Sequence, residues 1–203
     1  MFIPAAERIG LIDELSRDLL RKAAAAASRW PSDVTLSFNL SATQLAKPNA
    51  ARDIVATAQE SGLAPARLEI ELTETAIMKD LPAARATVDT LRAAGVRIAL
   101  DDFGAGYSSL AQVRDLALDR IKIDKSFVDR VCVDPKIASL TRAIVDMARR
   151  LDLPCVAEGI ETADQLEELK AGGCASGQGW LFAPAMPEAM AAHFLEERRA
   201  AAS

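Results

Sequence analysis

The stretch that decides the fold reads Val96-Arg97-Ile98-Ala99-Leu100-Asp101-Asp102-Phe103-Gly104-Ala105-Gly106-Tyr107-Ser108-Ser109. Its short apolar run predicts a buried strand, which stops at two adjacent carboxylates followed by a Gly-x-Gly turn. Neighbouring aspartates repel each other, so their position at the end of a core strand calls for a cation or a proton. Hard oxygen ligands of this kind suit Mg²⁺, Mn²⁺ or Ca²⁺. The alternative is a helix N-cap beside a solvated aspartate.

The composition predicts one globular domain with a sizeable core, because 50% of the 203 residues are hydrophobic. The net charge of −5 is spread along the chain, which excludes a basic surface for DNA or RNA. No apolar run approaches the length of a membrane span, so we expect no membrane insertion and a cytoplasmic protein. The single histidine, His193, lies far from every motif, and this excludes catalytic triads and histidine-based zinc sites.

The cysteines indicate neither a disulfide framework nor a zinc site. They are three in number and form no C-x-x-C pair, and we expect them to be reduced thiols in the core: Cys132, Cys155 and Cys174.

Strands and helices are predicted to alternate along the chain, which implies a parallel sheet. The strands are expected at 34–40, 68–72, 96–101, 120–124, 153–157 and 174–181. The helices are expected at 4–29, 49–62, 82–94, 108–116, from 135, from 163 and from 187. Asp134 before Pro135, and Thr162 with Gln165, are predicted N-terminal caps.

Each predicted strand carries a polar group near its end, and successive groups lie 20 to 36 residues apart, about one strand–helix unit. These groups are Asn39, Glu71, Asp101 with Asp102, Lys122, Glu158 and Gln178. In parallel α/β folds the active site gathers at the carboxyl ends of the strands, so we expect them to converge. A (β/α)₈ barrel needs eight strands and about 250 residues, whereas six strands are predicted here. An open doubly wound sheet therefore remains the alternative.

The oxygen ligands among these polar groups favour a site for two hard cations, with Asp101 placed to bridge them. Two such ions can bind a phosphodiester and activate a water molecule. Lys122 would serve the phosphate or the attacking water, and Gln178 would orient either. Structural roles remain open for each: Lys122 could pair with Asp124 or Asp102, Gln178 could bind loop backbone, and Glu158 could cap the next helix. A second interpretation treats Gly104-x-Gly106-x-x-Ser109 as a degenerate dinucleotide fingerprint, although Asp101 and Asp102 would repel a pyrophosphate.

At these residues the chain resembles the EAL-domain family of bacterial cyclic di-GMP phosphodiesterases, which have a modified TIM-barrel fold. The matching stretches run in order over nearly the whole chain: Phe2-Ile3-Pro4-Ala5-Ala6-Glu7, Asn39-Leu40-Ser41, Glu71-Leu72-Thr73-Glu74, 101–109, Ile121-Lys122-Ile123-Asp124, Ala157-Glu158-Gly159-Ile160-Glu161-Thr162 and Gln178-Gly179. The resemblance implies metal-dependent hydrolysis of cyclic di-GMP to linear pGpG. The alternative is a non-catalytic module that binds cyclic di-GMP or a protein partner.

The resemblance also implies roles for individual residues. Two Mg²⁺ or Mn²⁺ ions would be held by Asn39, Glu71, Asp101, Asp102 and Glu158. Lys122 would position the attacking water, Gln178 would support the centre, and Asp124, Gln178 and Gly179 would contact the substrate. Glu74 would hold the loop after Asp102, which in the family couples metal binding to dimerisation, and Glu161 would assist on the opposite side. That coupling would involve Phe103, Gly104, Gly106, Tyr107 and Ser108, in a homodimer.

The departure from the family lies at the N-terminus. The Glu-Ala-Leu tripeptide, whose Glu is a metal ligand in the family, should lie shortly before Phe2, and a nearby Arg that helps hold the substrate should accompany it. We therefore expect 1–203 to be a single, N-terminally incomplete domain of the EAL type, with the first barrel strands missing. A start site placed too far downstream, an artificially shortened chain and a natural remnant remain the competing explanations.

Overall fold

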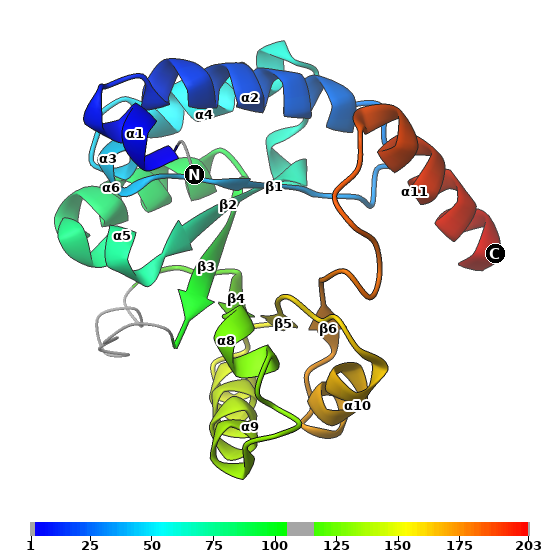
Figure 1. Cartoon of the computed structure of the whole chain (residues 1–203). Helices are drawn as coiled ribbons and strands as arrows, with labels where there is room; N and C mark the ends of the chain where they lie inside the picture. Colours follow the sequence, from blue (N-terminus) through cyan, green and yellow to red (C-terminus); the bar gives the residue numbers. More distant parts are fainter. Residues whose placement is uncertain (1–2, 105–115, 203) are drawn as a thin grey trace. The chain divides into compact units, whose positions relative to one another are not determined.

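The computed structural model describes residues 3–104 and 116–202, which alternate between strands and helices as the sequence predicts (Figure 1). The strands are β1 (Leu36–Asn39), β2 (Leu68–Thr73), β3 (Arg97–Phe103), β4 (Arg120–Ile123), β5 (Cys155–Ala157) and β6 (Ser176–Gly177). The longer helices are α2 (Ile12–Ala27), α4 (Ala50–Glu60), α6 (Leu81–Ala93), α9 (Pro135–Arg150), α10 (Ala163–Ala171) and α11 (Glu188–Ala202). The shorter helices are α1 (Ile3–Arg8), α3 (Ala42–Leu45), η1 (Pro65–Arg67), α5 (Glu74–Lys79) and α8 (Lys125–Val128).

The strand order decides between the two fold classes that the sequence left open. The described strands form one sheet in the order β1-β2-β3-β4-β5-β6. The pairs β3–β4, β4–β5 and β5–β6 are parallel. A doubly wound sheet reverses its order at a switch point, whereas consecutive order throughout is that of a (β/α) barrel. The fold is therefore of the TIM-barrel type, with six strands described where a full barrel has eight.

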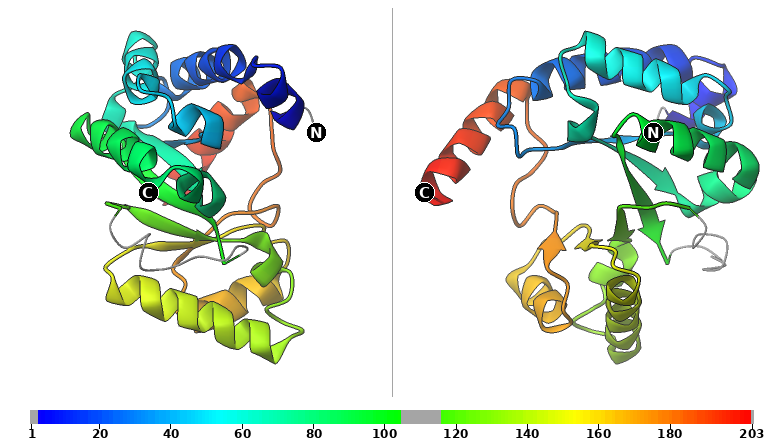
Figure 2. Two further views of the ribbon diagram at one scale, coloured as in Figure 1. Left: turned by 90° about the vertical axis from the view of Figure 1, so that its left-hand side faces the viewer. Right: turned by 180° about the vertical axis from the view of Figure 1, so that it is seen from behind.

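The chain divides into two compact units. The first comprises 1–70, 79–97 and 185–203. Within it α2 packs on α4 and on β1, and α4 packs on α6. Both views in Figure 2 show α2 and α4 as neighbours. The helices form because apolar side chains recur on one face of each; α2, for example, buries Ile12, Leu20 and Ala24.

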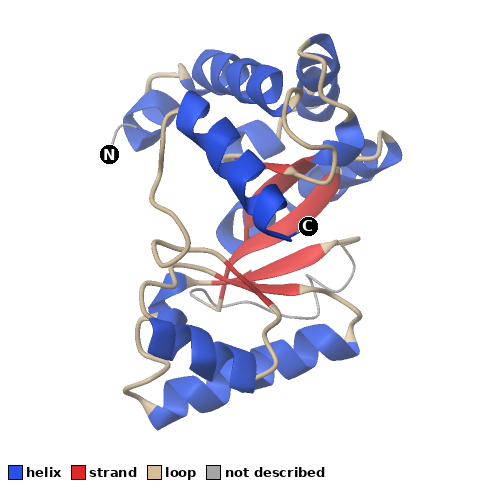
Figure 3. Ribbon diagram, turned by 90° about the vertical axis from the view of Figure 1, so that its right-hand side faces the viewer, coloured by secondary structure: helices blue, strands red, loops and turns tan. Residues whose placement is uncertain are grey.

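The second unit comprises 71–78 and 98–184, and it holds most of the predicted site. Here α9 packs on β4 and β5, and Figure 3 shows α9 and α10 on the same side of these strands. The core between them includes Ile123, Val128, Val145, Ala157, Ile160 and Leu169. Strand residues alternate between two faces, so burying Ile121 and Ile123 under the helices turns Lys122 to the opposite face.

Several local expectations were wrong. The predicted helix 4–29 is two helices, because Gly10 adopts a left-handed φ of 76° between α1 and α2. The short helices α3, α5 and α8 were not expected. The strands predicted at 153–157 and 174–181 shrink to β5 and the two-residue β6. The helix predicted at 108–116 lies almost wholly outside the described residues.

The burial of the cysteines differs from the expectation at one position. All three cysteines are free thiols, but Cys132 is exposed near the end of the turn before α9, so its prediction as a core residue was wrong. Among the helices that the structure describes, none has both the length and the apolar character needed to cross a bilayer.

Candidate functional site

The centre of the site is the ammonium group of Lys122 on β4. Its Nζ lies 2.8 Å from Glu71 Oε2 and 3.2 Å from Asp101 Oδ1, and it also pairs with Glu158 Oε1. The side chain of Lys122 is only 5% exposed, and those of the three carboxylates are 6%, 11% and 14% exposed. Glu71 comes from β2, Asp101 from β3 and Glu158 from the residue after β5. Four neighbouring strands of the sheet thus place one cation among three acids.

A β-bulge brings a fourth carboxylate to the same place. The pairing of β3 with β4 shifts between Leu100 and Phe103, and Asp102 adopts a left-handed φ of 54°. Consecutive residues of a regular strand point to opposite faces, but a bulge re-aims one of them. Carboxylate oxygens of Asp101, Asp102 and Glu158 accordingly lie within 4.8 Å of one another.

Gln178 holds the Glu158 carboxylate from the next strand. Its Nε2 donates to Glu158 Oε1 over 2.7 Å. The Gln178 backbone is fixed in turn, because its N–H donates to Ala157 O (2.9 Å) and its carbonyl accepts from Ile160 N–H (3.0 Å). Gly179 follows at the point where a Cβ would lie 2.2 Å from Ile160 O, so only glycine fits there. Among the described residues, the Gln178 side-chain amide donates to Glu158 and not to loop backbone, and Thr162 rather than Glu158 caps α10.

Burial and charge set the pKa values of these groups. Burial raises the pKa of Glu158 to about 6, although the Lys122 ammonium opposes the shift. Burial, and then the neighbouring charges of Asp101 and Asp124, raise the pKa of Asp102. Burial acts to lower the pKa of Lys122, but its bonds to Glu158 and Glu71 outweigh burial and hold that pKa above its ordinary value. Lys122 is therefore a fixed positive charge at neutral pH.

The other site residues that the sequence predicts near this cluster have contacts of their own. Glu74 is buried at the start of α5, and its Oε1 accepts from the Gly104 backbone N–H over 3.2 Å. Asp124 caps α8 by accepting from Ser126 N–H (3.0 Å). Glu161 pairs with Lys125 near the surface. Phe103 is buried at the end of β3, whereas Gly106, Tyr107 and Ser108 lie outside the described residues.

Asn39 belongs to the other compact unit, where its exposed side chain stands at the end of β1. Its place among the metal ligands stays a prediction. His193, on α11, is exposed, and its Nε2 lies 3.1 Å from Glu197 Oε1.

The donor set fits a hard divalent cation. Asp101, Asp102 and Glu158 offer carboxylate oxygens close enough to share one ion. Asp101 Oδ1 is buried, and among the described residues it accepts no hydrogen bond, only the ion pair with Lys122. That oxygen has lone pairs available to a metal. Oxygen donors of this kind suit hard cations such as Mg²⁺, Mn²⁺ or Ca²⁺. Zinc sites usually include cysteine or histidine, and this group of three residues contains neither.

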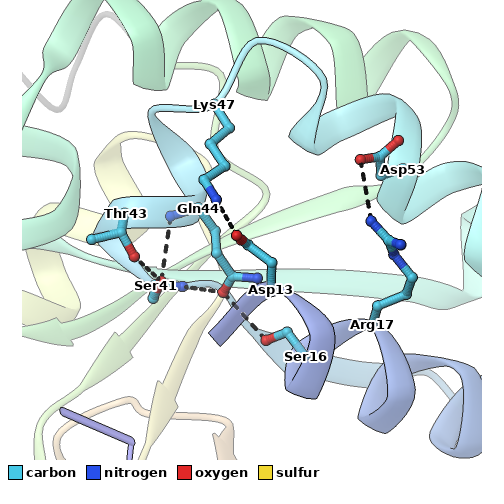
Figure 4. Close-up of polar contacts among 8 residues, drawn as sticks. All are labelled: Asp13, Ser16, Arg17, Ser41, Thr43, Gln44, Lys47 and Asp53. Carbon is cyan, nitrogen blue, oxygen red and sulfur yellow. Dashed lines mark hydrogen bonds and ion pairs between the residues drawn. The ribbon is translucent and has the colours of Figure 1, made fainter. Parts of the chain in front are cut away.

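A cavity of about 340 Å³ lies elsewhere, within the first unit, between α2, β1 and α4. Figure 4 shows the polar side chains around it. Asp13 pairs with Lys47, and Arg17 with Asp53, while Ser16 donates to Gln44 Oε1 over 3.3 Å. Because these groups satisfy one another, the cavity has no converging unpaired charge among its described lining residues. The carboxylate cluster is the better candidate for chemistry.

Comparisons with known proteins identify the family of the chain. Residues 1–185 match the EAL domain family. The cyclic di-GMP phosphodiesterase NbdA of Pseudomonas aeruginosa is 35% identical over an alignment 202 positions long, which covers 98% of this chain and 26% of that protein. A cyclic di-GMP complex of the phosphodiesterase PaMucR superposes with a TM-score of 0.89 at 36% identity, covering 94% of this chain and 78% of that one.

A manganese and cyclic di-GMP complex of Klebsiella pneumoniae BlrP1 superposes with a TM-score of 0.78 at 30% identity, covering 83% of this chain and 44% of that one. The curated relatives are longer, and the chain spans between 22% and 33% of their length. The family match over nearly the whole chain, the sequence identities and the fold lead to one conclusion: the chain belongs to the EAL-domain family.

Proposed function

We propose that this chain carries the catalytic centre of a metal-dependent phosphodiesterase that hydrolyses cyclic di-GMP to linear pGpG. The observation that carries the proposal is the cluster in which Glu71, Asp101, Asp102 and Glu158 surround Lys122 at the ends of adjacent strands. Relatives that are named for this activity, or that were crystallised with cyclic di-GMP and manganese, support the choice of substrate and metal.

The carboxylates would hold the cation, because Asp101, Asp102 and Glu158 already approach one another closely enough. Asn39 and Glu71 are the further ligands that we propose for a second ion. A divalent ion in this position supplies charge neutralisation for a phosphodiester and lowers the pKa of a bound water. Gln178 keeps Glu158 oriented through its 2.7 Å hydrogen bond.

Lys122 would provide the fixed positive charge beside the reacting phosphorus. Its ammonium can donate hydrogen bonds to a phosphate oxygen or to the attacking water, and it has no lone pair with which to act as a base. In the reaction the water oxygen bonds to phosphorus while one P–O3′ bond breaks. One water proton goes to the solvent or a carboxylate, and O3′ takes up a proton, so that pGpG ends in a 5′-phosphate and a free 3′-hydroxyl.

The test is the turnover of cyclic di-GMP by the 203-residue chain in Mn²⁺, with the nucleotide products separated by chromatography. We expect pGpG to appear, and we expect Glu158→Gln to lower its rate by about 100-fold or more, since it removes a charged ligand. Glu167→Gln is the matched control, because Glu167 is exposed on α10 and pairs only with Lys170 among the described residues.

Two results would count against the proposal. If the folded chain binds cyclic di-GMP in calorimetry but forms no pGpG, even when extended at its N-terminus, the non-catalytic binding module is the better description. If Glu158→Gln and Glu167→Gln turn over equally fast, the reaction does not depend on this cluster.

A further inference from the structure

Lys122 contacts two of the three carboxylate residues that could share a metal ion. Its Nζ contacts one oxygen from each of Glu71, Asp101 and Glu158, and two of these residues, Asp101 and Glu158, belong to the group that can share a cation. The ammonium is also enclosed, because Lys122 as a whole is only 4% exposed. Lys122 and a metal ion would therefore bind carboxylates of the same two residues, Asp101 and Glu158.

Neither the carboxylates nor the ammonium can stand alone in this environment. Buried charges need a partner, and removing one member of a buried ion pair leaves an uncompensated charge. Three carboxylates that converge on one point need another cation when no metal is bound. Conversely, a dication placed against Asp101 and Glu158 repels an ammonium held at the same two side chains.

We propose that Lys122 is the built-in counterion of the metal-free cluster and that an entering divalent cation displaces its ammonium from Asp101 and Glu158. The inference rests on the proposed metal site but not on turnover. Lysine suits this exchange because its ammonium is a point charge on a flexible four-carbon stem. While a single ion occupies the group of Asp101, Asp102 and Glu158, Glu71 is the partner that can retain Lys122, since it lies outside that group. Displacement thus moves the lysine rather than expelling it.

The decisive variant is Lys122→Met, which keeps the length of the side chain and removes its charge. Without the competitor we expect Mn²⁺ to bind at least about 10-fold more tightly in calorimetry, as a charge interaction of this kind allows. In EDTA the same variant should melt at a lower temperature than the wild type, because the acids lose their counterion. Saturating Mn²⁺ should therefore raise its melting temperature more than that of the wild type.

Two controls separate this effect from a general loss of charge. Lys170→Met removes an exposed lysine on α10 that pairs with Glu167, and we expect wild-type Mn²⁺ affinity. Lys122→Arg retains the positive charge, so it should show no gain in affinity. Equal Mn²⁺ affinity in the wild type and in folded Lys122→Met would overturn the inference while leaving the metal site intact. Failure of both proteins to bind Mn²⁺ would overturn the inference and the proposed function together.

A measurement on the wild-type chain covers the case in which Lys122→Met does not fold. A buried, ion-paired lysine ammonium exchanges its protons slowly enough to give a resolved ¹⁵N-correlated NMR signal, which Lys122→Arg would identify by its loss. We expect this signal to shift or broaden as Mg²⁺ is added, with half-saturation at the dissociation constant that calorimetry gives for Mg²⁺. A signal that stays unchanged while Mg²⁺ saturates the site would show that no displacement takes place.

Discussion

At the scale of single residues, the identity of the clustered side chains could be predicted but their mutual contacts could not. Glu71, Asp101, Lys122 and Glu158 were expected together because each ends a strand, and the ends of parallel strands share one edge. Their partners depend on backbone detail that spacing does not encode. A purely structural role for Lys122 had suggested Asp124 or Asp102 as its partner. Among the described residues, Lys122 pairs instead with Glu71, Asp101 and Glu158.

The bulge at Asp101 and Asp102 is the clearest case of information that the sequence lacked. An adjacent pair of aspartates on a regular strand would face opposite ways, so convergence requires the register shift and the left-handed φ at Asp102. Aspartate tolerates that conformation better than most residues. This tolerance is only a weak indication of a left-handed residue at Asp102, and it can be used only once the strand has been located.

Gly179 offers a prediction at the same scale. A Cβ added there would lie 2.2 Å from Ile160 O and 2.3 Å from Ile160 N, so Gly179→Ala must move backbone that also holds Gln178. We expect the free energy of unfolding to fall by about 3 kcal/mol, measured by urea denaturation. Gly10→Ala is the control, because it shares a positive φ but meets nothing within 4 Å. Equal losses for the two variants would contradict the steric argument.

At the scale of elements, the long periodic helices and the inner strands were predicted within a few residues. Here α9 begins at Pro135 behind the Asp134 cap, and α10 opens with the predicted Thr162–Gln165 capping box. The failures were short elements. The helix α3 has four residues and β6 has two, which is about one period of a helical or a strand pattern and too short to show a repeat. The signal that could have found α3 is its local capping box, in which the Ser41 hydroxyl accepts from Gln44 N–H and the Gln44 side chain accepts from Ser41 N–H.

The Thr162 cap is a prediction for an element. The Thr162 hydroxyl oxygen accepts from the Gln165 backbone N–H (3.3 Å), and the Gln165 side-chain oxygen Oε1 accepts from the Thr162 backbone N–H (3.0 Å). Thr162→Ala should lower stability by about 1 kcal/mol and speed amide hydrogen exchange in the first turn of α10. Thr162→Ser retains the hydroxyl acceptor and should behave like the wild type. If Thr162→Ala leaves both readouts unchanged, the cap contributes nothing to α10.

At the scale of the whole molecule, the order of the strands has a physical consequence. The order places β1 at one end of the described sheet and β6 at the other. A strand at a sheet edge presents unpaired backbone donors and acceptors that can pair with another chain. Near β6 the apolar side chains of Trp180, Leu181 and Phe182 are exposed as well, at 74%, 38% and 36%. An unpaired edge beside exposed apolar groups favours self-association.

We therefore expect the isolated 203-residue chain to self-associate as its concentration rises, as sedimentation velocity would show. A charge on an edge strand opposes such pairing, so Ser176→Lys, on the exposed part of β6, should shift the distribution toward monomer. Ser139→Lys places the same charge on the exposed face of α9, away from the edge, and should leave association unchanged. A wild-type chain that sediments as a single monomer at high concentration would show that these edges are covered by the chain itself. Equal effects of the two lysines would mean that net charge, and not the β6 edge, governs association.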